Sequence, residues 1–217
     1  NLNFFTMKTI SVLVSLLLTN CTLFPQGNDT QYVNRISAFS WMPDGKSILL
    51  NVLKIDKSEK SMPVASKYRF DINTTNIELL PIDGSGLAAS PDGKSVAYIK
   101  RVNNHDQIYA YEFVSKQHKP LVSDTLRKYA VGWSPDGNNL IYNTQTGRGS
   151  GAEVQICIFN ILTQQSAQIS KNTGYRSYGP VWNPKNDKIV YFLEKGDQHD
   201  QIYLTDAKGS FYANLTN

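Results

Sequence analysis

The tripeptide Pro-Asp-Gly occurs three times in this chain, each time directly before a short apolar run. The copies are Pro43-Asp44-Gly45, Pro91-Asp92-Gly93 and Pro135-Asp136-Gly137. Proline presets the backbone of a type I turn, and the glycine that follows readily adopts the left-handed conformation. We therefore expect each copy to be the tip of a β-hairpin with a three-residue loop and a bulge at the glycine.

A fourth, degenerate copy reads WNPKNDKIVYF at 182–192, where Pro184 is retained and Asn186 replaces the glycine. Asparagine tolerates positive φ better than other non-glycine residues, so the turn is expected to survive. The four tips at Gly45, Gly93, Gly137 and Asn186 are 48, 44 and 49 residues apart. This regular spacing identifies an internal repeat.

Each repeat also contains a second pair of apolar segments separated by a polar turn, as in KYRFDINTTNIELL at 67–80. One repeat is therefore four strands in about 45 residues, the length typical of a propeller blade. Stacked blades bury both sheet faces, which a single blade cannot do. We predict an all-β propeller of four-stranded antiparallel blades, with about four blades present and the ring incomplete. The expected blades are 35–83, 84–126, 127–172 and 173–217.

Several motifs resemble the WD40-like repeat of TolB-type six-bladed propellers. They are WSPDG (133–137), ASPDGKSVAY (89–98), QIYLTDAKGS (201–210) and NLTN (214–217). The resemblance covers roughly residues 35–217. Similar blades occur in periplasmic TolB, in envelope lipoproteins and in the propellers that precede the catalytic domain of prolyl-oligopeptidase-type serine peptidases. The fold alone does not choose among these functions.

The N-terminus has the pattern of a secretory signal. Residues 1–6 precede Met7 and are expected to carry no function, and 7–20 contain a nine-residue apolar run, Ile10–Leu18, after Lys8. That run is too short to span a bilayer. The following Cys21 resembles the acylated cysteine of a bacterial lipobox, although Asn20 departs from the small residue usual there. Residues 21–34 would then be a linker. The alternative is an ordinary cysteine in a signal that is cleaved elsewhere.

These features predict export across the inner membrane to the periplasm or outer membrane of a bacterium, with a lipid anchor as the only membrane attachment. Cys157, the second cysteine, lies in an expected strand and should be a small buried hydrophobe. The net charge of +4 comes from scattered basic residues, which argues against a nucleic-acid interface.

Sequence motifs of catalysis are absent: the chain contains no G-x-S-x-G, H-E-x-x-H or C-x-x-C. The segment HDQIY occurs twice, and its candidates for metal binding or catalysis are His105, Asp106, His199 and Asp200. Duplication of a loop whose Asp and Gln bond the backbone explains the repetition more simply. We therefore expect no catalytic residue, metal or cofactor in this chain.

In a propeller, the loops between strands two and three and the loops between blades share one end, opposite the Pro-Asp-Gly tips. The candidate binding residues at this end are Arg127, Lys128, Tyr129, Arg148, Tyr175, Arg176 and Tyr178. Tyr and Arg are enriched at binding hot spots, but solvated rim residues are the alternative. The expected function is a non-catalytic scaffold that binds another envelope protein or a peptide. The alternative is the N-terminal propeller of a serine peptidase whose catalytic domain is missing from this chain.

Overall fold

The computed structural model describes residues 31–58, 60–147, 149–171, 174–185, 187–194, 196 and 199–216. These residues form sixteen β-strands and one 3-10 turn, η1 (Gly149–Gly151). No helix among them is long and apolar enough to cross a membrane. The expected signal peptide at 7–20, Cys21, Arg148 and Asn186 lie outside the described residues.

The described chain divides into two compact units. Unit 1 holds the residues up to Phe39 together with Ser47–Pro81, and unit 2 holds Ser40–Lys46 together with the residues from Ile82 onward. The sheet of blade 1 has the strand order β1-β2-β3-β4. Its strands are β1 (Tyr32–Trp41), β2 (Ser47–Asp56), β3 (Val64–Asp71) and β4 (Ile77–Leu80). Apolar side chains of β2 and β3, such as Ile48, Leu50 and Phe70, form its core.

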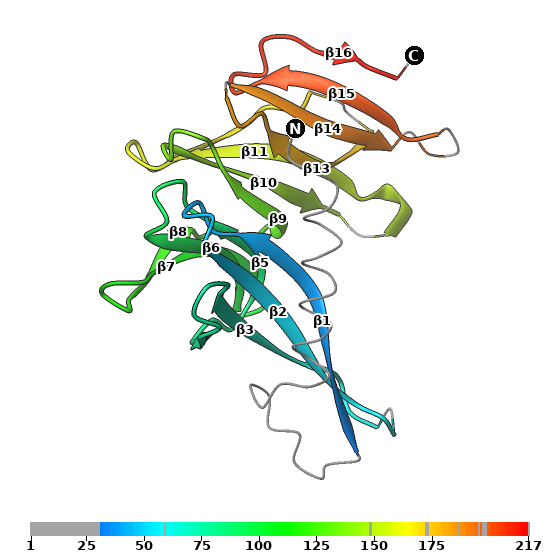
Figure 1. Ribbon diagram of the computed structural model, residues 1–217. Helices are drawn as coiled ribbons and strands as arrows, with labels where there is room; N and C mark the ends of the chain where they lie inside the picture. The colour runs from blue at the N-terminus through cyan, green and yellow to red at the C-terminus, as the bar shows by residue number, and fades with distance from the viewer. Residues whose placement is uncertain are drawn as a thin grey trace. The chain divides into compact units, whose positions relative to one another are not determined.

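Unit 2 contains three more blades, which are layered in chain order in Figure 1. A single parallel pair, Val154 with Arg176, joins the third and fourth blades into one eight-stranded sheet. Blade 2 comprises β5 (Ser85–Ala89), β6 (Ser95–Val102), β7 (His105–Glu112) and β8 (His118–Val122). Blade 3 comprises β9 (Arg127–Trp133), β10 (Asn139–Thr146), β11 (Glu153–Asn160) and β12 (Gln165–Gln168). Blade 4 comprises β13 (Arg176–Trp182), β14 (Lys188–Glu194), β15 (Gln201–Asp206) and β16 (Ala213–Asn214). Each blade is antiparallel throughout, which confirms the predicted all-β architecture of four-stranded blades.

The packing of unit 2 follows from alternation along the middle strands. Ala97 and Ile99 of blade 2 face Leu140 and Tyr142 of blade 3 in one buried cluster. The next residue on β10, Ile141, points the other way and joins a second cluster with side chains of blade 4. Since successive strand residues point to opposite faces, a middle strand between two blades must be apolar on both faces.

The hairpin tips adopt the left-handed backbone that the turn sequence predicts. Gly45, Gly93 and Gly137 have φ values of +63°, +70° and +73°. In blade 2, the Gly93 amide donates to the Ser90 carbonyl at 2.8 Å, and the Ser90 amide donates to the Ser95 carbonyl at 2.8 Å. The loop therefore holds four residues between Ser90 and Ser95, so the expected three-residue loop with a bulge is wrong.

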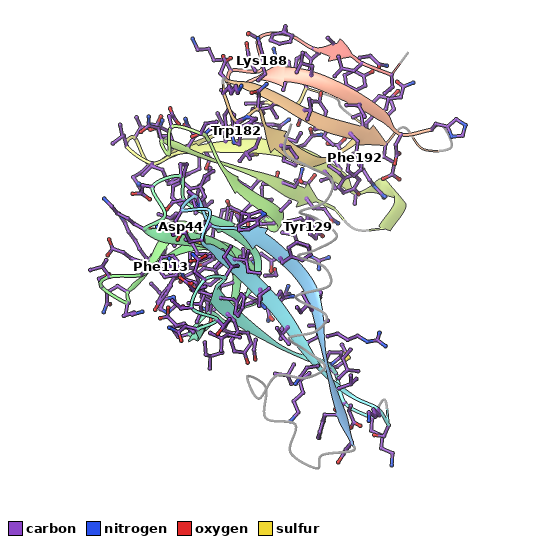
Figure 2. All side chains as sticks on the ribbon, viewed as in Figure 1. Asp44, Phe113, Tyr129, Trp182, Lys188 and Phe192 are labelled. Carbon is purple, nitrogen blue, oxygen red and sulfur yellow. The ribbon has the colours of Figure 1, made fainter. Side chains whose placement is uncertain are left out.

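In the second and third copies, the serine before Pro-Asp-Gly explains the extra residue, whereas the first copy has Met42 at this position. Because the Ser90 carbonyl already accepts the Gly93 amide, the Ser90 hydroxyl takes its place and accepts the Ser95 amide at 2.9 Å. In blade 3 the Ser134 hydroxyl accepts the Asn139 amide at 2.9 Å in the same way. The tip is also joined to the turn after the third strand, since the amide of Phe113 (Figure 2) donates to the Lys94 carbonyl at 2.9 Å.

Candidate functional site

The loop end of unit 2 carries most of the predicted binding residues. Arg127, Lys128 and Tyr129 begin β9, Arg176 and Tyr178 lie on β13, and Tyr175 directly precedes β13. Both β9 and β13 are the first strands of their blades, and the polypeptide enters each blade at this end. The predicted residues therefore lie on or beside the first strands of two blades, but the environments of their side chains differ.

Lys128 is buried, with a side chain of 0% relative exposure. Its Nζ donates to the Asp106 carbonyl at 2.9 Å, to the Leu126 carbonyl at 3.2 Å and to Asp124 Oδ1 at 2.5 Å. A buried ammonium is tolerated when its three donors are satisfied in this way. Since Asp106 is the second residue of β7, Lys128 joins the third strand of blade 2 to the first strand of blade 3. Its contacts give it a structural role.

Arg176 organises the loop between β10 and β11. Its Nε donates to the Ala152 carbonyl at 3.0 Å, and its Nη2 donates to the Gly149 carbonyl at 2.8 Å. Its Nη1 lies 3.5 Å from a carboxylate oxygen of Glu194. The planar guanidinium can hold several acceptors in fixed directions. Arg176 therefore fixes the turn η1 of blade 3 from the first strand of blade 4.

The aromatic candidates separate into two groups. Tyr129 (Figure 2) donates its hydroxyl to Gln145 Oε1, and the Arg127 guanidinium lies 5.8 Å from the centre of the Tyr129 ring. Tyr178 instead stacks on Phe192 with ring centres 5.4 Å apart. Arg127 is exposed, and Tyr175 is 41% exposed. Among the described candidates, these two are the residues that the loop end presents most openly to solvent.

The two HDQIY copies do not converge. Asp106 pairs with Arg101 at 3.3 Å and accepts the Lys128 amide at 3.4 Å, so the carboxylate is engaged by its own hairpin and by the first strand of blade 3. His105 begins β7 of blade 2, whereas His199 and Asp200 precede β15 of blade 4. Within the described part of the chain, no group of three or more His, Cys, Asp or Glu side chains could hold a metal ion.

Cys157 is buried on β11, 3.6 Å from the Thr144 hydroxyl. Burial raises the pKa of its thiol, and the Thr144 hydrogen bond opposes this only in part. A raised pKa keeps the sulfur in its protonated, weakly nucleophilic form. The sequence prediction of a small buried hydrophobe at this position is consistent with this environment.

Two carboxylates at hairpin tips, those of Asp92 and Asp136, have lowered pKa values. The Ser134 hydroxyl, which donates to Asp136 Oδ1 at 2.5 Å, is the largest cause for Asp136, followed by the Asn138 amide. Ser90 and the Lys94 amide lower the pKa of Asp92 in the same order. Acceptance of two hydrogen bonds favours the charged carboxylate. These ionised groups stabilise turns and are not poised for proton transfer near neutral pH.

Comparisons with known proteins agree with the repeat architecture. No protein-family model matches the chain. A curated relative, the Tol-Pal system protein TolB of Francisella tularensis subsp. tularensis (strain WY96-3418), is 24% identical over 190 residues, which cover 86% of this chain and 42% of the relative. The crystal structure of TolB from Acinetobacter baumannii matches with a TM-score of 0.66 at 20% identity, over 84% of this chain and 43% of that chain.

A peptidase shares the same architecture. The acylaminoacyl peptidase of Pyrococcus horikoshii matches with a TM-score of 0.64 at 14% identity, over 85% of this chain and 32% of that chain. At such low identity the solved structures show the fold alone. The chain spans less than half the length of the curated relative that it matches.

Proposed function

Because the chain is a TolB-like β-propeller, we propose that it acts as a non-catalytic scaffold of the bacterial cell envelope. Its ligand would be another envelope protein or a peptide, bound at the loop end of unit 2. The curated relatives are named as Tol-Pal system proteins, which supports an envelope role and a partner within such a system. The apolar run Ile10–Leu18 followed by Cys21 supports export and lipid anchoring.

This proposal rests on the hydrogen bonds that Lys128 and Arg176 make at the loop end. Lys128 and Arg176 donate hydrogen bonds to backbone carbonyls, which holds the segment between blades 2 and 3 and the β10–β11 loop of blade 3 in position. Arg127 and Tyr175 are exposed to solvent at this end of the blades. Preorganised loops that present an arginine and a tyrosine suit the recognition of a protein surface.

A catalytic site at the loop end would require several reactive side chains close together. A nucleophile, its base and an orienting group must lie within hydrogen-bonding distance of one another. Among the described residues, His105 and His199 lie on different, non-adjacent blades, and the Cys157 thiol is buried. This arrangement favours binding over chemistry.

A second candidate function has one observation in its favour. The peptidase of Pyrococcus horikoshii has the same blade architecture, and this chain covers only 32% of it. The chain would then be the N-terminal propeller of a serine peptidase. The coding sequence downstream of residue 217 distinguishes the two functions. A G-x-S-x-G followed by Asp and His would favour the peptidase, and further Pro-Asp-Gly repeats before a stop codon would favour the scaffold.

Binding can be tested directly with the purified chain and the Pal protein of the same bacterium by biolayer interferometry. The double variant Arg127→Glu/Tyr175→Ala should weaken the complex by about 10-fold or more, because it removes both exposed groups. Leu162→Ser is the control, since Leu162 is 80% exposed in the β11–β12 turn at the opposite end. No binding, or equal loss in both variants, would contradict a partner site at the loop end.

A further inference from the structure

The turn between β3 and β4 contains an acceptor motif for N-linked glycosylation. Asn73-Thr74-Thr75 has the form Asn-x-Thr, in which the asparagine side-chain nitrogen receives the sugar. Three other copies of the motif begin at Asn20, Asn28 and Asn214, and the first two lie outside the described residues. Asn73 alone has an acidic residue, Asp71, two positions before it, which completes the longer motif that bacterial oligosaccharyltransferases recognise.

Backbone hydrogen bonds hold this turn on the surface of blade 1. The Asp71 amide donates to the Asn76 carbonyl at 2.9 Å, so four residues form the loop between them. Asp71 Oδ1 accepts the amides of Asn73 and Thr74 at 2.9 and 2.8 Å. All residues from Asn73 to Asn76 are exposed. The motif therefore lies in a surface turn, which is the setting expected of a glycosylated asparagine in a secreted protein.

The internal repeat shows how accessible the position of Asn73 is. Val114 of blade 2 and Leu162 of blade 3 occupy the equivalent turn position, and their side chains are 86% and 80% exposed. Even large apolar side chains therefore stay in solvent at this position. In blade 1 the side-chain amide of Asn73 makes no hydrogen bond to any described residue. The nitrogen that would receive the sugar is open to a transferase.

The motif at Asn214 has a different environment. Asn214 lies in β16, where its backbone pairs with Tyr203. Its Nδ2 donates to Gln201 Oε1 at 2.7 Å, and its Oδ1 accepts the Thr216 amide at 2.9 Å. Tyr212, not an acidic residue, stands two positions before it. Because both ends of the side-chain amide are engaged, the structure favours Asn73 over Asn214 as an acceptor.

We propose that Asn73 is an acceptor site for N-linked glycosylation. Its use in the cell rests on the export that the proposed function includes, but not on the partner site at the loop end. In the reaction, Asn73 Nδ2 attacks the anomeric carbon of a polyprenyl-diphosphate-linked oligosaccharide. A carbon–nitrogen bond forms, the bond from that carbon to the diphosphate oxygen breaks, and polyprenyl diphosphate leaves. The nitrogen gives up one proton to the transferase, and nothing is oxidised or reduced.

Reaction of the purified, folded chain with a bacterial oligosaccharyltransferase and its polyprenyl-diphosphate-linked oligosaccharide tests this proposal. The intact mass should increase by one oligosaccharide, and peptide mapping should place it on Asn73. Asn73→Gln and Thr75→Ala should lose the mass increase, whereas Thr75→Ser keeps the hydroxyl group and should retain it. Asn214→Gln is the matched control and should be modified like the wild type.

Asp71→Asn separates recognition by the transferase from the structure of the turn. Asn160 Oδ1 accepts the amides of Leu162 and Thr163 in the equivalent turn of blade 3, so an asparagine can form this turn. The variant should keep its circular dichroism spectrum and lose the modification.

An unmodified wild type, in a reaction that modifies a peptide carrying the same motif, would overturn the proposal. A glycan that maps to Asn214 and not to Asn73 would overturn it equally. Because the purified reaction does not depend on export, either result would leave the proposed function intact. A chain that cell fractionation finds in the cytoplasm would contradict the proposed function and not the acceptor site.

Discussion

The indole Nε1 of Trp133 donates a hydrogen bond of 3.1 Å to the carbonyl of Ala88, which lies 45 residues earlier in the chain. The donor ends the first strand of blade 3, and the acceptor lies in the first strand of blade 2. The tryptophan of the repeat therefore joins one blade to the preceding blade. Trp182 occupies the equivalent position in blade 4, but its Nε1 is buried and has no hydrogen-bond partner among the described residues.

This difference predicts unequal effects of the same substitution. Trp133→Phe should destabilise the fold by about 1–3 kcal/mol more than the lost packing alone, because the Ala88 carbonyl loses its donor. Trp182→Phe removes an unsatisfied donor and should cost only packing. Urea denaturation of both variants measures the difference, and equal losses would show that the hydrogen bond to Ala88 contributes nothing.

Lys128 should be a larger contributor to stability than its neighbour. Lys128→Met removes the donor of two backbone carbonyls and of the partly exposed Asp124 carboxylate, so we expect a loss of about 2–4 kcal/mol. Arg127→Met changes the adjacent, exposed cation and should alter stability by less than about 0.5 kcal/mol. Denaturant midpoints of the two variants give the comparison. Similar midpoints would mean that Lys128 is not the structural link described above.

Asp136 should make stability depend on acid pH. Its folded-state pKa lies below the ordinary value, chiefly because of the Ser134 hydroxyl, so its stabilising contribution is present above the unfolded pKa. That contribution should disappear over the pH interval that runs from the ordinary value of 3.8 down through the lower, folded pKa. The free-energy difference between wild type and Asp136→Asn should therefore shrink over this interval. A difference that is constant with pH would contradict the role of the ionised carboxylate.

The proposed lipid anchor depends on one residue outside the described part of the chain. Expression in a bacterial host with labelled palmitate should give a labelled, membrane-associated protein. Cys21→Ser should lose the label and move to the soluble periplasmic fraction. Cys157→Ser is the control, because this buried thiol should not affect fractionation. An unlabelled wild type that fractionates like Cys21→Ser would leave an ordinary secretory signal at this end.

Local turn chemistry made the blades predictable from the sequence. Proline, aspartate and glycine act on their own backbone, so the positions of the hairpin tips and the positive φ of Gly93 and Gly137 could be foreseen. The length of the loop could not, because it depends on the Ser90 and Ser134 hydroxyls replacing a backbone acceptor.

The candidate site was less predictable, because its geometry depends on contacts between distant segments. The sequence placed Lys128 among exposed binding residues, but its Nζ reaches the Asp106 carbonyl, 22 residues away in the previous blade. Arg176 likewise reaches Gly149, 27 residues earlier. The residues next to a lysine or arginine in the sequence do not indicate which distant backbone carbonyls its side chain will contact. The sequence shows a tryptophan at this position in three of the four repeats, and Ala89 replaces it in blade 2. The acceptor of Trp133 in the preceding blade could not be predicted.

A hydrolysis assay of the purified chain tests directly whether the propeller is a scaffold without catalysis. Peptide and ester substrates are offered with and without divalent metal ions, alongside His105→Ala and His199→Ala. We expect no turnover above background in any sample, because His105 and His199 lie on non-adjacent blades and the described residues form no metal-binding group. Turnover by the wild type that either histidine substitution abolishes would contradict this expectation and would make HDQIY a catalytic element.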